Sequence, residues 1–380
     1  MDCKLSDDHR LLRESVRAFA EAEIRPLARD LDEREAFSVE LTTRMGALGL
    51  FGIAVPEEYG GQGMDRLAYV VAVEELARVD GSQAATVTAG NLGIGPIYHF
   101  GTEAQKHRYL PSLCAGEGLW SFALTEPNAG SDLRSLQTRA VESDAGWTLD
   151  GTKTFITNAS NPLSRGVSVL AVTGGSGRDL ELSFFLVEHG TPGFDAAPLH
   201  GKLCWRASDT AELHFSECTV PASALLGTRG GGLKAALDTL DTGRLGIAAM
   251  GLGAAQGAFE AALAYAKERK QFGQPIGSFE GVSFSLADMA TRIEHARSFL
   301  YQTAWRSDTG RSYATEAAMA KLYCTEVAGE VTDAAVQIHG GYGLMHDSPV
   351  ERFFRDHRIL RIGEGTSEIQ RVVIARALGL

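Results

Sequence analysis

One carboxylate near the C-terminus has a sequence context that would make it a strong base. In the stretch RILRIGEGTSEIQR, Glu364 lies between Gly363 and Gly365 and follows an apolar run. Glycines on both sides let backbone and ligand approach closely, because they carry no side chain. Apolar neighbours exclude water from a carboxylate, which raises its pKa and strengthens it as a base. The pattern therefore indicates that Glu364 is a candidate catalytic base.

The same stretch has a second interpretation, in which Glu364 is an ordinary acid in a loop before a helix. Ser367 and Gln370 have the spacing of a capping box. Apolar residues then recur at helical spacing, at Ile369, Val372, Val373 and Ala377. The stretch alone leaves both interpretations open.

Hydroxyl groups and one aromatic ring in the middle of the chain could hold a planar, phosphorylated ligand. In ALTEPNAGSD a strand ends, and Thr125 and Ser131 bring hydroxyls to a tight loop whose backbone N–H groups could bind a flavin edge or a phosphate. In KTFITN, Phe155 and Thr157 are two apart and share one face of a strand. An ordinary turn and an inward core phenylalanine are the alternatives.

Two further motifs have glycine or basic residues in suggestive places. In ERKQFGQPIG, Arg269 and Lys270 end a long helix, where they either compensate the helix dipole or clamp a pyrophosphate. GLGAAQG at 251–257 lacks the preceding strand of a dinucleotide-binding loop and lies in an Ala-rich helix, so close helix packing explains its glycines better. HGGYG at 339–343 has no accompanying G-x-S-x-G elbow, which argues against a serine hydrolase.

The helices and strands predicted from the sequence form three successive regions. Helical patterns run from Ser6 to about Ile24 and around 38–49, 65–79, 84–99 and 103–113. Short β-branched and aromatic runs follow, with Asp150-Gly151 as a predicted hairpin turn. Long helices return at roughly 231–270, 279–308 and 314–339. We predict an α+β multidomain fold with a helical domain at 1–115, a β-barrel or sandwich domain at 116–226 and a helical domain at 227–380.

Composition limits the classes of function. Of 380 residues 44% are hydrophobic, and the net charge of -12 argues against a nucleic-acid surface. The five cysteines, including Cys3, show no metal-ligand or disulfide spacing, so we expect reduced thiols and no metal. The N-terminal stretch MDCKLSDDHRLL is unlike a secretion signal, and no uncharged apolar run approaches 20 residues. These features predict a cytoplasmic protein without a membrane span.

Taken together, the motifs resemble the acyl-CoA dehydrogenase family of flavoenzymes over essentially the whole chain. The matching segments occur in the family's order: ALTEPNAGSD, KTFITN, KLCWRASDT followed by VP, RKQFGQPIG, QIHGGYG and RIGEGTSEIQR. The resemblance implies FAD as cofactor, a C-terminal four-helix bundle and a homotetramer built as a dimer of dimers, with a dimer as the alternative. It also implies fatty acid metabolism of the β-oxidation type, with an electron-transferring flavoprotein as electron acceptor.

The resemblance also assigns roles to individual residues. Leu124, Thr125 and Thr157 would meet the flavin ring, with Phe155 lying against it where many relatives have Trp. Thr366 and Glu368 would approach FAD, and Ser131 would lie near the flavin phosphates or the thioester. The FAD bound mainly by the neighbouring subunit would be contacted by Arg269, Phe272, Gln337 and Gly341. Ser131, Arg244 and Gly365 would contact substrate.

Glu364 takes the role of the base in this resemblance. It would remove the α-proton of a thioester while the β-hydrogen leaves as hydride to flavin N5, giving a trans-2-enoyl product. The Glu364 backbone N–H and an FAD ribityl hydroxyl would bind the thioester oxygen. Some relatives place the base just before the arginine that Arg244 matches, and in this chain that position is Gly243. This favours the short-chain, butyryl-type branch over the isovaleryl type.

Several points stay open in the sequence. Cys204 and Arg134 depart from the family pattern near the flavin and the thioester carrier respectively. A close alternative is dehydrogenation of an acyl group tethered to a carrier protein. More distant alternatives are a flavin oxidase or monooxygenase of the same fold and a silent flavin- or CoA-binding protein. The segment 86–97, TVTAGNLGIGPI, is expected to line the acyl pocket, but its sequence does not give the acyl length.

Overall fold

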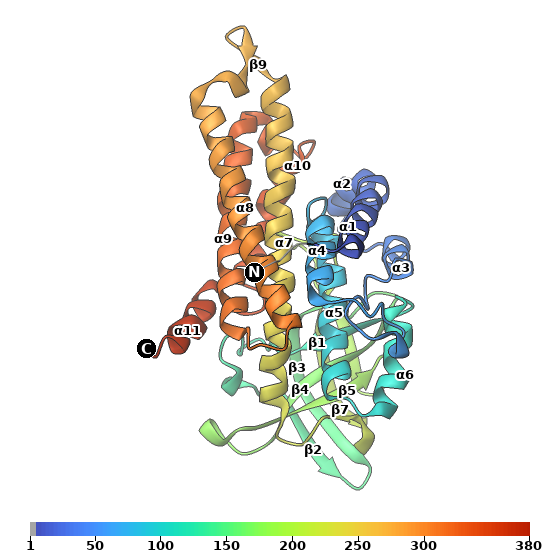
Figure 1. Ribbon diagram of the computed structural model, residues 1–380. Helices are drawn as coiled ribbons and strands as arrows, with labels where there is room; N and C mark the ends of the chain where they lie inside the picture. The colour runs from blue at the N-terminus through green and yellow to red at the C-terminus, as the bar shows by residue number, and fades with distance from the viewer. Residues whose placement is uncertain (1–4) are drawn as a thin grey trace.

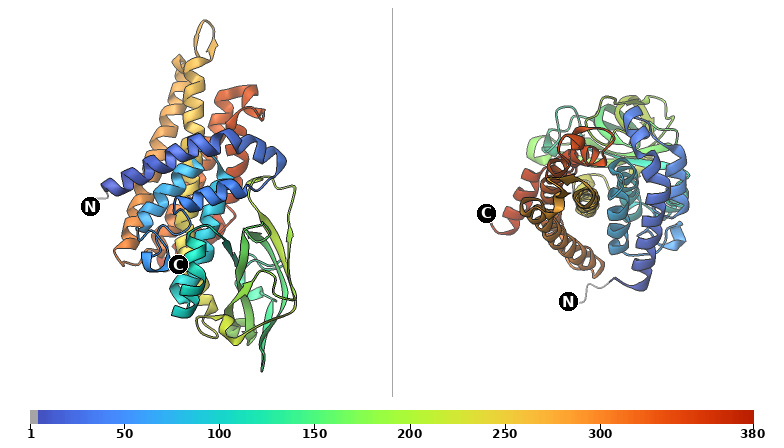
Figure 2. Two further views of the ribbon diagram at one scale, coloured as in Figure 1. Left: turned by 90° about the vertical axis from the view of Figure 1, so that its right-hand side faces the viewer. Right: turned by 90° about the horizontal axis from the view of Figure 1, so that it is seen from above.

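The computed structural model describes residues 5–380, and Cys3 lies outside this range. Before the first strand the chain is helical, as predicted. The helices are α1 (Asp7–Phe19), α2 (Arg25–Arg34), α3 (Val39–Ala47), α4 (Arg66–Ala77), α5 (Gly81–Phe100) and α6 (Glu103–Cys114). Helices α4 and α5 form an inner layer that packs on α7 (Gly232–Glu268), whereas α1 covers α4 and both α3 and α6 contact α5 (Figure 2).

The predicted end of the first helix near Ile24 is wrong, because the helical path continues to Arg34. A π-helical turn at Ala20–Ile24 joins α1 to α2, and the Arg25 N–H donates to the carbonyl of Ala20, five residues back. Pro26 follows at the start of α2 and has no N–H to donate. The wider turn thus accommodates the proline, and the helix does not stop.

The strands of the middle region form one mixed eight-stranded sheet. They are β1 (Leu119–Ala123), β2 (Arg139–Ser143), β3 (Gly146–Thr157), β4 (Ser164–Gly174), β5 (Glu181–Glu188), β6 (Phe194–Pro198), β7 (Thr210–Val220) and β8 (Leu225–Leu226). Their order is β6-β7-β3-β2-β4-β5-β8, with β1 paired to β4. The rings of Trp147 on β3 and Phe185 on β5 lie 5.0 Å apart although these strands are not neighbours. The sheet therefore curls over its own core, like a partly open barrel.

The predicted hairpin turn at Asp150-Gly151 is wrong, because β3 runs straight through both residues. The chain reverses just before β3 begins, so that Ser143 pairs with Gly146. Gly151 instead marks an irregularity in the pairing of β3 with β7 and has a φ of +149°. A Cβ there would lie 2.5 Å from the Thr138 hydroxyl. The glycine thus serves a bulge with a close neighbour rather than a turn.

The C-terminal region is the four-helix bundle that the family resemblance implied. Its long helices are α7, α8 (Glu280–Asp308) and α9 (Ala314–His339), completed by α10 (Pro349–Leu360), and α11 (Ser367–Ala377) packs on α9. A small hairpin, β9 (Lys270–Gln271) with β10 (Gln274–Pro275), projects at the end of the bundle away from the sheet (Figure 1). Helix α10 was not predicted from the sequence, although Pro349 stands at its first position, a preferred place for proline.

Helix α7 is the core of the molecule, and its glycines confirm the close packing that the sequence predicted. A Cβ at Gly251 would lie 3.0 Å from the Cys324 carbonyl, and Gly253 and Gly257 abut the carbonyls of Glu74 and Arg78. By length and composition α7 also passes as a membrane span, the only such helix between residues 5 and 380. Because 67% of its apolar window is buried inside the fold, its composition suits a core helix.

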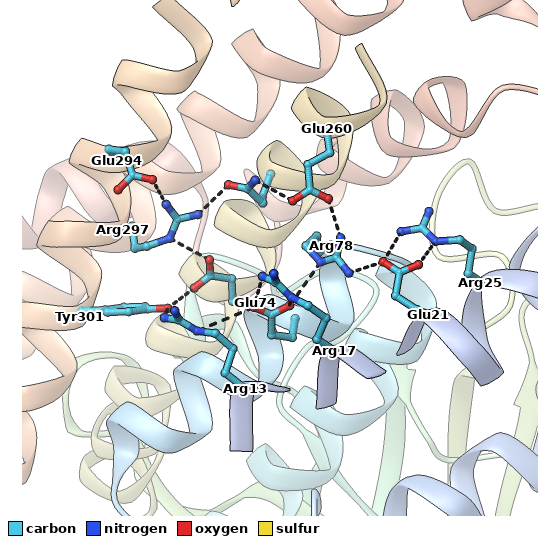
Figure 3. Close-up of polar contacts among 12 residues, drawn as sticks. Arg13, Arg17, Glu21, Arg25, Glu74, Arg78, Glu260, Glu294, Arg297 and Tyr301 are labelled. Carbon is cyan, nitrogen blue, oxygen red and sulfur yellow. Dashed lines mark hydrogen bonds and ion pairs between the residues drawn. The ribbon is translucent and has the colours of Figure 1, made fainter. Parts of the chain in front are cut away.

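A network of ion pairs joins the N-terminal helices to the bundle (Figure 3). Glu74 and Glu75 on α4 are only 4% and 2% exposed. Glu74 accepts hydrogen bonds from Arg297 Nε (3.0 Å) and the Tyr301 hydroxyl (2.5 Å) on α8. Both oxygens of Glu75 accept from Arg17 on α1 at 2.8 Å. Every buried carboxylate oxygen of this network therefore has a donor.

Candidate active site

The turn that carries Glu364 lies between α10 and α11 and has an unusual backbone. Glu364 has a φ of +52° and Gly365 a φ of +91°, so two successive residues occupy the left-handed region. A non-glycine residue in this region is uncommon and costs free energy unless its surroundings hold it. The strained turn is therefore fixed by contacts from elsewhere in the fold.

The predicted capping box at Ser367 is wrong. Thr366 is the N-cap of α11 and accepts from the Ile369 N–H, while the Ser367 hydroxyl donates to Glu326 Oε1 at 2.8 Å. Gln370 Nε2 reaches back to the carbonyl oxygens of Gly365 (2.8 Å) and Glu364 (3.3 Å). Thr366 thus caps the helix, while Gln370 holds the turn that precedes it.

Glu364 is half-buried as a residue, and the Oε2 atom of its carboxylate is shielded from solvent. Its Oε2 has no hydrogen-bond partner among residues 5–380. A Cβ at Gly243 on α7 would overlap this oxygen, so the carboxylate occupies the space that a side chain at position 243 would need. Burial raises the pKa of Glu364 to about 7, and the charges of Lys321 and Arg244 act in the opposite direction. A carboxylate in this state is a stronger base than one in water.

Two buried cations lie near the carboxylate. Arg244, on α7 next to Gly243, is 5% exposed and donates through Nη1 to Asp241. Lys321, on α9, is fully buried, and its Nζ donates to the Gly365 carbonyl at 2.6 Å. Arg244 and Gly365 were predicted from the sequence, whereas Lys321, Gln370 and Tyr69 were missed. The negative charge of Glu364, after burial itself, raises the pKa of Tyr69.

A cavity of about 270 Å³ adjoins Gly243 and lies among α4, α5 and α7. Its wall includes Tyr69, Leu92 and Thr239, and Leu92 also approaches the position of a Cβ on Gly243. Of the 86–97 segment that we expected to line an acyl pocket, the wall contains Thr88, Asn91, Leu92, Ile94 and Gly95. Polar groups, among them Arg66, Thr242 and Asp308, complete the wall. Glu364 is not part of this wall, but its Oε2 lies against Gly243, which is.

The flavin contacts proposed for the β domain come together where β1 ends beside β3. The Thr154 N–H donates to the carbonyl of Thr125 at 2.9 Å, which ties the two segments. Phe155 is 70% exposed with a φ of +60°, at an irregularity in β3. The hydroxyls of Thr125 and Thr157 have no partner in the described part of the chain, and Ser131 lies exposed in the loop beyond. An exposed ring and free hydroxyls suit a planar ligand with polar edges.

A buried ion pair, which was not predicted from the sequence, holds this flavin-contact segment. Lys153 is 0% exposed and donates to the Leu124 carbonyl (2.9 Å) and to Glu126 Oε1 (2.8 Å). Glu126 also accepts from the N–H groups of Gln137 and Thr138 at 2.6 and 3.0 Å. The signal present in the sequence was an acid in ALTEP, Glu126, and a basic residue in KTFITN, Lys153.

The residues that the resemblance assigns to a neighbouring subunit's FAD lie at the other end of the bundle (Figure 1). Phe272 at the tip of the β9–β10 hairpin is 93% exposed, and the Arg269 guanidinium lies 5.6 Å from the Tyr342 ring. Gln337 near the end of α9 is exposed, and Gly341 has open space at its Cβ position. Within one chain, these four residues therefore lie away from the proposed flavin contacts of the β domain.

The two departures from the family pattern have different surroundings. Cys204 precedes Trp205, whose N–H donates to Asp356 on α10 at 2.8 Å, and burial raises the pKa of the Cys204 thiol to about 11. Its loop therefore packs on the bundle. Arg134 is exposed, and its N–H donates to Asp132 at 3.0 Å. Cys114, Cys204, Cys218 and Cys324 are all free thiols.

Known proteins are similar to this chain in sequence. Models of the N-terminal, middle and C-terminal domains of acyl-CoA dehydrogenase match residues 6–117, 121–218 and 230–379. The chain is 46% identical to the probable acyl-CoA dehydrogenase YngJ of Bacillus subtilis, with 100% of both proteins covered. It is 43% identical to a short-chain specific acyl-CoA dehydrogenase of Clostridium acetobutylicum, with 99% of both covered.

Solved structures of the following proteins are also similar to this chain. Butyryl-CoA dehydrogenase from Megasphaera elsdenii is 41% identical with a TM-score of 0.97, covering 100% of both chains. A chain of the structure described as the electron transferring flavoprotein of Acidaminococcus fermentans is 43% identical with a TM-score of 0.97, covering 100% and 99%. The prolyl acyl carrier protein oxidase AnaB is 33% identical with a TM-score of 0.95, covering 99% of this chain and 100% of that one.

Proposed function

The chain belongs to the acyl-CoA dehydrogenase family of FAD-dependent oxidoreductases, and we propose that it converts a short-chain or branched short-chain acyl-CoA to the trans-2-enoyl-CoA. The observation that carries this proposal is the unpaired, buried Oε2 of Glu364, which lies against Gly243 in the wall of a cavity of about 270 Å³. The names of the relatives, short-chain specific and butyryl-CoA dehydrogenase, support the substrate class.

Glu364 acts as the base on the α-carbon. A pKa of about 7 leaves a substantial fraction ionised at neutral pH and gives a base matched to that pH. Exclusion of water keeps the carboxylate basic. FAD, when bound, supplies the acceptor for the β-hydrogen, which leaves as hydride.

The Glu364 backbone supplies a donor for the thioester oxygen. Its N–H has no carbonyl partner within residues 5–380, while the preceding N–H of Gly363 donates to Ile359 at 2.8 Å. A free N–H beside the base stabilises negative charge on the thioester oxygen as the α-proton leaves. The left-handed φ of Glu364 therefore positions both the acid and the donor.

The cofactor would be held by two surfaces. Leu124, Thr125, Phe155 and Thr157 would contact the flavin ring from the β domain, and Ser131 would lie near a phosphate or the thioester. Thr366 and Glu368 would approach it from the turn after Glu364. From a second subunit, the hairpin and the end of α9 would contribute Arg269, Phe272, Gln337 and Gly341. This division supports a dimer as the smallest complete unit, with a dimer of dimers as the proposed assembly.

An electron-transferring flavoprotein is the proposed electron acceptor, supported by a similar chain in the Acidaminococcus structure. A second candidate function is dehydrogenation of a carrier-tethered acyl group, which the similarity to a prolyl acyl carrier protein oxidase supports. Efficient turnover of free acyl-CoA would argue against the carrier version. Fast reoxidation of the reduced protein by air would instead indicate an oxidase.

An anaerobic absorbance titration tests the proposed function. Purified holoenzyme is titrated with straight and branched acyl-CoAs of four to eight carbons, and the oxidised flavin band is followed. We expect one short-chain substrate to bleach the band, with its enoyl product identified by mass spectrometry. A yellow protein that no acyl-CoA bleaches would overturn the acyl-CoA assignment, and a protein that cannot take up FAD would overturn the cofactor.

A further inference from the structure

A lysine on α9 is buried beside the base without a carboxylate bonded to it. Lys321 is 0% exposed, and its one hydrogen bond within residues 5–380 goes to the Gly365 carbonyl at 2.6 Å. An ammonium group in a protein interior is costly unless an opposite charge lies near. The buried ammonium group of Lys321 therefore requires a counter-charge near it.

The charged groups around Lys321 leave Glu364 as its main counter-charge. Glu364 contributes the largest favourable interaction, while Arg244 on α7 repels it and is already bonded to Asp241. Glu326 on α9 pairs with Arg361 at 2.9 Å, and Glu368 on α11 is exposed. On the cavity side Tyr69 of α4 is neutral, because its pKa is raised. Among these acids, Glu364 is the one with a buried oxygen that has no hydrogen-bond partner within residues 5–380.

Lys321 and Gln370 share one acceptor but differ in charge. Both donate to the Gly365 carbonyl, at 2.6 Å and 2.8 Å, so both hold the left-handed turn that carries the base. Loss of either donor would loosen the turn. Loss of Lys321 alone would also remove a positive charge from the surroundings of Glu364. The pair thus allows positioning and electrostatic effects to be separated.

We propose that Lys321 is a positioning residue for the dehydrogenation, holding the Glu364 turn through the Gly365 carbonyl and keeping the Glu364 carboxylate ionised through its charge. The inference rests on the proposed role of Glu364 as base. Without this charge, burial would favour the protonated acid, which cannot accept the α-proton. With it, the base stays available near neutral pH.

The test compares the variants Lys321→Met, Lys321→Gln and Gln370→Met. The pH dependence of the first-order rate of flavin reduction is measured by stopped flow with the substrate found in the acyl-CoA panel. Both Lys321 variants should move the acid-limb midpoint to higher pH by roughly 1 to 3 units, because an opposite charge has been lost. Gln370→Met should slow reduction but leave the midpoint in place.

Other readouts keep the outcomes distinct. FAD content and thermal unfolding establish that each variant is folded, and Lys321→Gln, which keeps a donor, serves where Lys321→Met does not fold. If neither Lys321 variant moves the midpoint, or if Gln370→Met moves it equally, the proposal is overturned. Glu364→Gln is included in the same series. Full activity in Glu364→Gln would reject the base itself, a failure separate from that of Lys321.

Discussion

Two of the regions that withdraw carboxylate oxygens from water treat them in opposite ways. In the ion-pair network of α1, α4 and α8, Glu74 accepts two hydrogen bonds and Glu75 three, all from arginine or tyrosine side chains (Figure 3). At the turn before α11, the buried Oε2 of Glu364 is unpaired within residues 5–380, and the nearby cations Lys321 and Arg244 bond elsewhere. Burial alone therefore does not identify a catalytic acid. The lack of a bonded donor, close to a cavity, is what distinguishes Glu364 from Glu74 and Glu75.

The difference follows from what each carboxylate has to do. A structural carboxylate is most stable when every oxygen is bonded, because an unpaired buried charge is costly. A base must keep a lone pair free for the proton that it accepts. The fold supplies charge to Glu364 through Lys321 and Arg244 but supplies no donor to Oε2 from the described part of the chain. Substitutions in each region test this difference between the paired carboxylates and Glu364.

The largest effect is expected from Glu364→Gln. The amide cannot accept the α-proton, so the rate of flavin reduction should fall by about 10² to 10⁴. Stability should hold or rise, because a buried, unpaired acid becomes neutral. Stopped-flow reduction and urea unfolding measure the two effects. A variant that is both inactive and strongly destabilised would place Glu364 with the structural carboxylates instead.

Gly243→Ala tests the space that Oε2 occupies. The added Cβ would overlap Oε2 and displace the base, and a displacement of about 1 Å costs a rate factor of about 10². Gly281→Ala on α8, where nothing lies within 4 Å of the new Cβ, is the matched control and should reduce flavin normally. Normal reduction in a folded Gly243→Ala protein would contradict the placement of the carboxylate against α7.

Arg297→Met tests the opposite region. Arg297 bonds Glu74, Glu294 and Gln256, so its loss leaves buried Glu74 with one donor fewer and should lower the free energy of unfolding by about 3 kcal/mol. The exposed Arg34→Met, which loses a pair with Asp30, should change it by less than about 1 kcal/mol. The pH profile of flavin reduction should stay unchanged, and a shifted midpoint would couple the network to the base.

The smallest effect is an opposite pH dependence of stability. Glu21, bonded to Arg25 and Arg78, has a pKa lowered from 4.5 to about 2, so its contribution is present above 4.5 and lost as pH falls toward 2. Glu364 has a pKa raised to about 7, so the folded state binds the extra proton and its contribution declines as pH rises from 4.5 to 7. Melting temperatures of Glu21→Gln and Glu364→Gln across pH 3 to 8 should change slope in opposite senses. Equal changes would contradict the contrast.

Local patterns predicted the order of helical and strand-rich regions and marked Glu364 as a candidate, and the family resemblance of the motifs then selected it over an ordinary loop acid. Helical and strand periodicities, and a glycine-flanked acid after an apolar run, are visible without any tertiary contact. The sequence did not reveal Lys321, because a lysine in an Ala-rich helix is indistinguishable from a surface lysine. Its partner is a carbonyl 44 residues away in the chain. Long-range contacts of this kind have no local signal.

The errors have the same origin. Ser367 and Gln370 have the spacing of a capping box. In the structure, however, Ser367 bonds Glu326 on α9 and Gln370 bonds the Gly365 carbonyl. These other partners replace the contacts that the local pattern predicts. Asp150-Gly151 fits a hairpin turn, yet a neighbouring Thr138 requires the glycine within a continuous strand. In both cases the residue types serve contacts that the sequence does not display.

Exchange of the substrate α-proton with deuterium from the solvent directly tests whether Glu364 is the base. Holoenzyme is incubated anaerobically with the acyl-CoA identified in the titration, and deuterium at the α-carbon is followed by mass spectrometry. The wild-type protein should catalyse exchange, while a folded, FAD-containing Glu364→Gln variant should exchange at the uncatalysed rate. Exchange by that variant at the wild-type rate would contradict the assignment of Glu364 as the base.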